Sequence, residues 1–204
     1  MSKVKITYFD LRARAELARL VMVAAKKDFE DVRVQFPDWP KLKADSLYGT
    51  LPVLDIGGKQ YFQGNAIATY LARENGLYGE NNLEGLMIDQ MVDLKEDVLR
   101  EEAKTVFGSD ESKAEAAKKL PTDVYPRIFK IFTYCIQQND KKSGFLVGNK
   151  VSLGDLAVYE GTQMCFQNDA KFLDDFKEIK ALRAKVESCP GLKEYLAKRK
   201  VTPI

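Results

Sequence analysis

Leu51-Pro52-Val53-Leu54-Asp55, followed after Gly57-Gly58 by Tyr61-Phe62-Gln63-Gly64-Asn65, is the stretch that decides the fold of this chain. Proline has no N–H to give to a sheet ladder, so Pro52 fits at the first residue of a strand. The two glycines permit a tight turn into a second strand. An apolar helical pattern follows and is expected to begin near Ala66. The stretch therefore predicts a β-hairpin that leads directly into a helix.

The same stretch offers backbone groups to a ligand. A residue that precedes a proline is held extended, so Leu51 can present its N–H and C=O to a peptide lying alongside. Gly64 and Asn65 stand where the helix opens, and the first N–H groups of a helix have no internal partners. Such donors suit a carboxylate. An edge that binds a peptide, beside a helix start that binds an anion, indicates a site for a small acidic peptide.

The composition is that of an ordinary globular protein. The 204 residues are 45% hydrophobic and 30% charged, and Lys plus Arg 32 against Asp plus Glu 30 leaves a net charge of +2. The charges are interspersed without a basic block, which argues against nucleic acid or a membrane surface as a partner. No apolar run approaches the length of a membrane span and no signal-peptide core follows Met1, so a cytoplasmic protein is expected.

Cysteine and histidine usage restricts the chemistry. The three cysteines, Cys135, Cys165 and Cys189, are widely spaced in apolar patterns and are expected to be buried packing thiols. The chain contains no histidine. This excludes Ser-His-Asp and Cys-His catalysis and nearly all catalytic zinc sites. Catalysis must then use Tyr, Arg, Lys, a carboxylate or a group on the ligand.

The first part of the chain predicts a small α/β domain. Apolar and polar residues alternate over 4–8 and again over 32–36, so the second predicted strand ends at Phe36. An apolar stripe at helical spacing lies between them, over 17–24. Two strands joined by a helix form a parallel β-α-β unit with a right-handed crossover. With the hairpin and its helix, we expect this domain to occupy residues 1–76.

The rest of the chain is expected to be all helical. Residues 77–82 form a polar, glycine-rich linker, and residues 83–204 carry apolar stripes at helical spacing. Within them Ser152 and Asp155 have the spacing of a capping box at a helix start, with Val151 placed to staple onto Leu156. An α/β domain followed by a helical bundle is the predicted architecture.

A set of motifs runs through nearly the whole sequence in a characteristic order. They are Thr7-Tyr8-Phe9, Arg12-Ala13-Arg14-Ala15-Glu16, Asp38-Trp39-Pro40 with Lys43, Leu51-Pro52-Val53-Leu54-Asp55, Gln63, Tyr70-Leu71-Ala72-Arg73-Glu74, Phe145-Leu146-Val147-Gly148-Asn149 and Ser152-x-x-Asp155. In these the chain resembles the cytosolic glutathione transferases, and within them the sigma class, which includes glutathione-dependent prostaglandin D synthases and lens S-crystallins. The resemblance implies a thioredoxin-like domain that binds glutathione, and an all-helical domain that lines a pocket for hydrophobic electrophiles.

The resemblance places the catalytic tyrosine at Tyr8. A free thiol with a pKa near 8.5 is only about 3% thiolate at pH 7, and lowering that pKa by ~2 needs about 2.7 kcal/mol. One hydrogen bond to a charged acceptor contributes roughly 1.5–3 kcal/mol. A protonated tyrosine hydroxyl can therefore supply most of the stabilisation, and the glutathione sulfur becomes the nucleophile. By the same resemblance, Arg14 lies beside the thiolate and adds positive potential.

The resemblance also implies where glutathione binds. The implied contacts are Tyr8 at the sulfur, Trp39 and Lys43 at the glycine end, Leu51 along the cysteinyl backbone, Pro52 in the cis form, Gln63 and Gly64 at the γ-glutamyl end, and Asp97 reaching across a dimer interface. Phe9, Arg14 and Phe107 are the expected walls of the hydrophobic pocket. Asp93, Glu96 and Asp97 form an acidic patch on one helix, at which we expect no metal ion.

Two positions depart from the family pattern. Most of the family has Gln-Ser where this chain has Gln63-Gly64, so a hydroxyl donor to the γ-glutamyl carboxylate is lost and weaker glutathione binding is expected. The usual Arg-Gly-Arg-Ala-Glu is Arg12-Ala13-Arg14-Ala15-Glu16 here, which indicates a slightly altered backbone beside the thiol.

These observations predict a homodimeric glutathione transferase that adds the glutathione thiolate to hydrophobic electrophiles, as in detoxification. Two alternatives stay open. The first is isomerisation of a prostaglandin endoperoxide with glutathione as a recycled cofactor, with which Arg14 is equally compatible. The second is a crystallin-like or ligand-carrying protein of low activity, which Gly64 favours and the retained Tyr8, Trp39 and Lys43 oppose.

Overall fold

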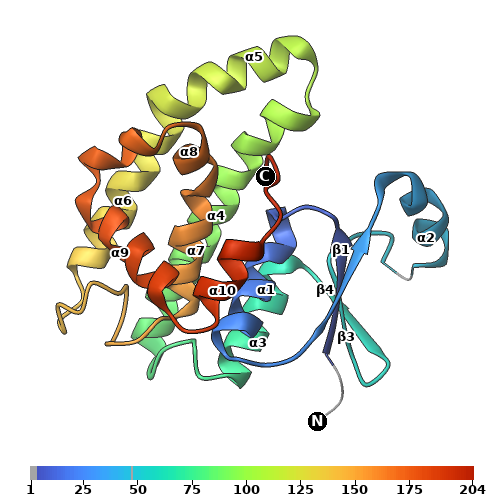
Figure 1. Ribbon diagram of the computed structural model, residues 1–204, viewed down its shortest axis with the longest axis horizontal. Coiled ribbons are helices and arrows are strands. Elements are labelled where there is room, and N and C mark those ends of the chain that lie inside the picture. Colours follow the sequence, from blue (N-terminus) through green and yellow to red (C-terminus); the bar gives the residue numbers. More distant parts are fainter. Residues whose placement is uncertain (1–3, 47) are drawn as a thin grey trace.

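The computed structural model describes residues 4–46 and 48–204 (Figure 1). Its sheet contains β1 (Val4–Phe9), β2 (Glu30–Val34), β3 (Val53–Ile56) and β4 (Lys59–Phe62), in the order β2-β1-β3-β4. Strand β1 runs parallel to β2, and β3 runs antiparallel to both β1 and β4. The predicted β-α-β unit followed by a hairpin is therefore confirmed.

Two details of this half differ from the prediction. Phe36 was expected to end the second strand, but it opens a 3₁₀ turn, Phe36–Asp38. Pro37 is the reason, because proline cannot continue a ladder of hydrogen bonds. Helix α3 (Gly64–Glu74) begins two residues before the expected Ala66, so Gly64 is already its first residue.

Three helices accompany the sheet: α1 (Ala13–Ala24), α2 (Trp39–Asp45) and α3. Helices α1 and α3 pack together and lie between the sheet and the helices of the second half, whereas α2 lies at the outer end of the sheet (Figure 1). The residues that open α1 and α3 therefore face the junction between the two halves of the molecule.

The second half is helical, as predicted. It contains α4 (Asn82–Phe107), α5 (Asp110–Lys119), a π-helical turn (Leu120–Val124), α6 (Tyr125–Gln137), α7 (Leu153–Gly161), α8 (Gln163–Asn168), a 3₁₀ segment (Ala170–Asp175), α9 (Lys177–Ser188) and α10 (Leu192–Lys198). In the part of the chain that the structure describes, no helix is both long and apolar enough to cross a membrane.

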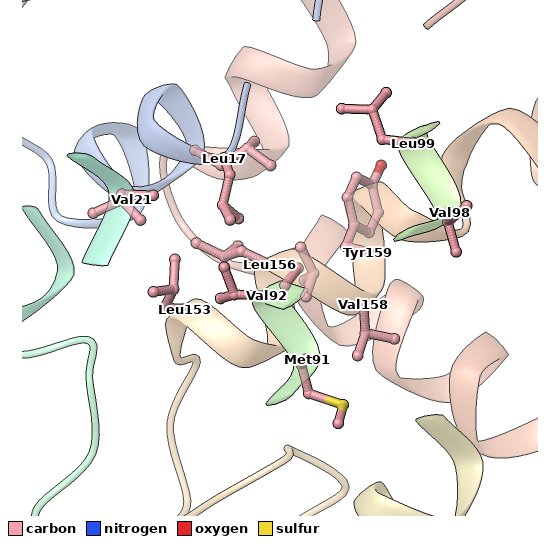
Figure 2. Close-up of a cluster of buried hydrophobic side chains, with 14 of the residues drawn as sticks. Leu17, Val21, Met91, Val92, Val98, Leu99, Leu153, Leu156, Val158 and Tyr159 are labelled. Carbon is pink, nitrogen blue, oxygen red and sulfur yellow. The ribbon is translucent and has the colours of Figure 1, made fainter. Parts of the chain in front are cut away.

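A continuous apolar core joins the two halves. Leu17 and Val21 of α1, Val92 of α4 and Leu156 of α7 are at most 2% exposed and lie in one cluster (Figure 2). Burying a side chain of this size contributes roughly 1.5–3 kcal/mol, so the contact between α1 and the helical half is strongly favoured. The core fixes the start of α1 relative to α4, and the candidate site lies at that junction.

The predicted capping box is present. Asp155 Oδ2 accepts hydrogen bonds from the Ser152 N–H at 2.7 Å and from the Ser152 hydroxyl at 2.6 Å, and its Oδ1 accepts one from the Leu146 N–H at 2.7 Å. Burial raises the pKa of this carboxyl to about 6. The box therefore fixes the start of α7 and also attaches the loop that precedes it.

The prediction for the cysteines is correct for one of the three. All are free thiols, but only Cys165 is buried, while Cys135 and Cys189 are half-buried. The apolar spacing correctly indicated that all three thiols contact the core, but Cys135 and Cys189 lie at its margin. Burial raises the pKa of each thiol, to about 12 for Cys165.

Candidate functional site

Tyr8 lies near the end of β1, at the junction of the two halves. Its side chain is buried, with 5% exposed. Burial raises the pKa of the hydroxyl, and a hydrogen bond from the Arg14 backbone N–H and the positive charges of Arg14 and Arg19 oppose that rise only in part. Tyr8 is therefore a neutral hydroxyl at physiological pH and can donate a hydrogen bond to an anion.

Arg14 stands in the first turn of α1. Its side chain is 50% exposed, and its Nε lies 3.1 Å from Oε1 of Glu96 on α4. This ion pair links the two halves of the molecule beside Tyr8. The charge of Arg14 contributes to the potential around Tyr8, and Glu96 offsets part of it.

The start of α1 is held by Arg12, which is 3% exposed. Its guanidinium donates to Glu160 at 3.2 Å, to Gln167 at 2.8 Å and to the Thr202 backbone at 3.1 Å. Breaking such a buried network leaves uncompensated charge, which is strongly destabilising. Arg12 therefore anchors the segment that carries Arg14, a role that the sequence motif alone did not reveal.

The hairpin presents the backbone that the sequence analysis expected to bind a peptide. The Leu51–Pro52 peptide bond is cis. The pairing of β3 with β1 and β4 begins at Val53, so Leu51 lies just outside the ladder. Pairing of its backbone with an extended ligand stays a prediction.

Gln63 and the start of α3 form the adjoining part of the site. Gln63 has φ +75°, a left-handed conformation that is costly for a residue with a side chain, and its side chain makes no cap hydrogen bond to the helix. Such strain persists where the surrounding structure imposes it and is concentrated at functional sites. The N–H groups at the start of α3 lack intrahelical partners.

Gly64 has a steric role that was not predicted. A Cβ built on Gly64 would lie 2.5 Å from the backbone oxygen of Arg14. The structure leaves no room for a serine Cβ at this position unless the Arg14 backbone moves, so the close approach of α1 gives a steric reason for glycine here. Weaker glutathione binding through the lost hydroxyl stays a prediction.

Aromatic side chains form one wall beside Tyr8. Phe9 stacks on Phe36 with ring centroids 4.6 Å apart and meets the edge of Trp39 at 5.7 Å. Phe36 in turn contacts Phe107 of α4 at 6.2 Å. The two predicted pocket residues, Phe9 and Phe107, thus belong to one cluster through Phe36, which the sequence analysis had placed in a strand. Phe36 and Phe107 are 50% and 58% exposed and can contact an apolar ligand.

The remaining predicted residues lie at the edges of the site. Trp39 is half-buried and Lys43, one turn further along α2, is exposed. On α4, Asp97 is 58% exposed and lies 3.6 Å from Arg100. Glu96 pairs with Arg14 instead of joining Asp93 and Asp97, and within residues 4–46 and 48–204 no three acidic or thiol groups gather as metal ligands.

Lys95 is a buried residue that the sequence analysis missed. It is 3% exposed, and its Nζ lies 3.5 Å from the carbonyl oxygen of Ala13, the first residue of α1. Burial lowers the pKa of this amine. Its signal was in the sequence, because Lys95 falls in the apolar stripe of α4 between Met91 and Val98.

The site suits a peptide that carries a thiolate and a carboxylate. It combines the neutral hydroxyl of Tyr8, the guanidinium of Arg14, the unpaired backbone at Leu51 and the uncapped start of α3. The fold and these groups define a thioredoxin-like, glutathione-using transferase. Two family descriptions match the chain: "Glutathione S-transferase, N-terminal domain" over residues 4–73 and "Glutathione S-transferase, C-terminal domain" over residues 96–199. The chain belongs to the glutathione S-transferase family, and glutathione is its co-substrate.

Similar proteins cover the chain from end to end. "Probable glutathione S-transferase 6" of Caenorhabditis elegans is 34% identical, over 98% of each chain, and "Hematopoietic prostaglandin D synthase" of Gallus gallus is 32% identical, over 100% of each. Among solved structures, a Fasciola hepatica sigma class transferase superposes with TM-score 0.89 at 28% identity, over 100% of this chain and 99% of the other. A transferase of Necator americanus described as monomeric has TM-score 0.88 and 31% identity, over 99% and 100% of the two chains.

Proposed function

We propose that this transferase, a sigma-class member, activates the glutathione thiol through Tyr8 and adds it to hydrophobic electrophiles. The observation that carries the proposal is the Tyr8 hydroxyl, buried and neutral, beside the backbone N–H and the guanidinium of Arg14. A hydroxyl fixed in this way donates to the sulfur as negative charge develops, without reorganisation at the moment of reaction. The thiolate forms a bond to the electrophilic carbon, and the leaving group departs with the electron pair.

Glutathione would lie along the open edge of the first half. Leu51 would pair with the cysteinyl backbone, and Gln63, with the N–H groups that open α3, would receive the γ-glutamyl carboxylate. Trp39 and Lys43 would hold the glycine end. This assignment treats residues 1–76 as the glutathione-binding domain, 77–82 as the linker and 83–204 as the domain that lines the electrophile site.

The electrophile would lie against the aromatic cluster of Phe9, Phe36 and Phe107. Two of these rings are at least half exposed, and flat aromatic compounds gain area burial and stacking on such a surface. Detoxification of reactive aromatic compounds is the role that this wall supports best. The free state of all three cysteines agrees with a cytoplasmic location, where thiols stay reduced.

We further propose a two-fold symmetric homodimer formed through the face of β4 and α3. Tyr61, Phe62 and Tyr70 are between 42% and 48% exposed there, and with Tyr48 they line a hollow of about 410 Å³. Exposed apolar patches of this kind mark interaction surfaces. In such a dimer Asp97 would reach the γ-glutamyl ammonium in the other subunit.

Isomerisation of a prostaglandin endoperoxide is the second candidate. The similarity to the prostaglandin D synthase of Gallus gallus favours it. A low-activity, crystallin-like role loses its main support, since Gly64 has a steric reason in this structure.

The deciding experiment is retention on immobilised glutathione, followed by conjugation of a chlorodinitrobenzene and, separately, conversion of a prostaglandin endoperoxide. Retention with conjugation supports the first proposal. Endoperoxide conversion without conjugation would favour the isomerase, and retention without either activity would favour a carrier.

A further inference from the structure

Helix α3 and the start of α1 approach each other closely at one point, where residue 64 has no side chain. The backbone oxygen of Arg14 lies 2.5 Å from where a Cβ of residue 64 would be, and the Arg14 carbonyl carbon and Cβ lie 3.4 Å away. Real Cβ contacts essentially never fall below 3.0 Å, so any side chain at position 64 must push these atoms apart by about 0.5 Å. The obstacle is a main-chain oxygen, which cannot rotate away as a flexible side chain would.

The segment that would be pushed is already constrained from two other sides. Ala13 has φ +34°, a left-handed conformation that only glycine adopts freely, and its carbonyl oxygen faces the buried Lys95 Nζ at 3.5 Å. Arg12, one residue earlier, is fixed by its buried hydrogen bonds to Glu160 and Thr202. The backbone of Arg14 therefore has little freedom to absorb the displacement.

The same backbone also reaches Tyr8. The Arg14 backbone N–H is directed toward the Tyr8 hydroxyl closely enough to lower the Tyr8 pKa against the larger effect of burial. A hydroxyl that accepts a hydrogen bond is polarised and becomes a better donor of its own proton, because hydrogen bonds in a chain reinforce one another. The contact at Gly64 and the group that stabilises the thiolate are thus joined through a single residue.

We propose that Gly64 is a positioning residue for the reaction: its missing side chain lets the Arg14 backbone lie where its N–H orients and polarises the Tyr8 hydroxyl toward the glutathione sulfur. The inference rests on the proposed function of Tyr8. It reverses the effect expected from a lost hydroxyl, because a serine at position 64 would impair the site instead of improving it.

The test compares Gly64→Ala and Gly64→Ser with the parent in the rate of conjugation from about pH 6 to pH 9, together with glutathione affinity by calorimetry. Both variants should lose up to about tenfold in kcat near neutral pH, because a misplaced Tyr8 hydroxyl donates a weaker hydrogen bond to the reacting charge. The apparent pKa of bound glutathione should rise by about 1, so the loss should shrink at high pH. A merely structural defect would lower the rate equally at every pH.

Gly161→Ala is the matched control. It adds the same methyl group to another buried helical glycine, where its nearest neighbours would be Phe132 and Lys95 atoms at 3.4 to 3.5 Å, an ordinary contact. It should leave the pH profile unchanged. Ala13→Gly in the Gly64→Ala background should recover part of the rate, since a glycine at 13 gives the Arg14 backbone room to refit. If Gly64→Ala alone does not fold, Ala13→Gly and Ala13→Gly/Gly64→Ala are compared instead.

Two outcomes would overturn the inference. One is tighter glutathione binding by Gly64→Ser with an unchanged pH profile, which would restore the hydroxyl account. The other is a normal profile in both Gly64 variants while Tyr8→Phe remains defective. If Tyr8→Phe itself has a normal profile, the proposed function of Tyr8 fails, and that result is distinct from failure at Gly64.

Discussion

Nε of Arg14 lies 3.1 Å from Oε1 of Glu96 and joins the first turn of α1 to the middle of α4. Arg14 is half exposed while Glu96 is only 12% exposed, so the carboxylate is the fixed partner and the guanidinium the adaptable one. The pair balances positive charge beside Tyr8 and also attaches the glutathione-binding half to the helical half. In the proposed site, Glu96 would set how much of the Arg14 charge a bound thiolate experiences.

Glu96→Gln should raise activity at slightly acidic pH. With the carboxylate gone, the Arg14 charge is no longer offset and stabilises the thiolate more. A partly exposed ion pair is worth roughly 0.2–1 kcal/mol, so kcat/KM near pH 6 should rise about 1.4-fold to five-fold. Arg14→Gln should lower kcat/KM at the same pH. Lys104→Gln, which removes an exposed charge paired with Glu101 on the same helix, is the control and should have no effect on the pH profile.

Tyr8→Phe should lower the conjugation rate at pH 7 by about tenfold to a hundredfold, while glutathione binding changes little. The substitution removes only the hydrogen bond to the thiolate, worth roughly 1.5–3 kcal/mol. Because the folded environment raises the pKa of Tyr8, the parent keeps its proton throughout the neutral range. The thiolate absorbance of bound glutathione, followed against pH, should shift upward in the variant. Equal profiles for parent and variant would assign thiol activation to Arg14 instead.

Phe62→Ser should weaken self-association. The Phe62 ring is 42% exposed and lies against Tyr48 with ring centroids 4.0 Å apart, on the face proposed to meet a second copy. Sedimentation velocity should show a dimer for the parent and a larger monomer fraction for the variant. Tyr134→Ser is the control, since Tyr134 is 61% exposed on α6, away from that face. A parent protein that sediments as a fully active monomer would contradict the proposed dimer and the proposed role of Asp97.

Glu102 should make stability depend on pH. Burial raises the pKa of this carboxyl from 4.5 to about 8, although a hydrogen bond from the Tyr125 hydroxyl at 3.0 Å acts in the opposite direction. The folded state therefore holds a proton that the unfolded chain releases above about pH 4.5. The resulting stabilisation is complete below that pH and is lost as pH rises through about 8.

Glu102→Gln should remove this dependence, because the amide has the same size, stays neutral and can still accept from Tyr125. Between about pH 5 and pH 9, the parent should lose more free energy of unfolding than the variant by a margin on the order of 4 kcal/mol. Urea denaturation at the two pH values measures the difference. Parallel losses in the two proteins would show that Glu102 does not carry the proton.

The fold could be read from the sequence because its signals are local. Proline at position 52, the two-glycine turn and the alternation in the first strand fix the hairpin and the sheet through backbone chemistry that each residue carries with it. The capping box of Ser152 and Asp155 is equally local and is present as expected. Phe36 was misplaced because Pro37, directly after it, overrides an apolar alternation.

The chemistry of the site was readable in part. The motifs marked Tyr8 and Arg14, and the structure brings these two together with Glu96. Lys95 and Glu102 were missed, although both interrupt the apolar stripe of α4. Charged residues in such a stripe are either solvated or buried with partners, and the sequence does not say which elements supply those partners.

The sequence by itself determined the order of strands and helices along the chain, the proline that precedes β3 and the residue types available for catalysis, because these depend on short stretches of chain. Only the tertiary structure showed the structural roles of Ala13 and Gly64. The two residues are 51 positions apart in the sequence and both depart from the family pattern, and the folded chain places them on either side of the Arg14 backbone. The physical reason is that steric fit between two helices depends on how they pack, and a missing Cβ has an effect only where another backbone fills its place.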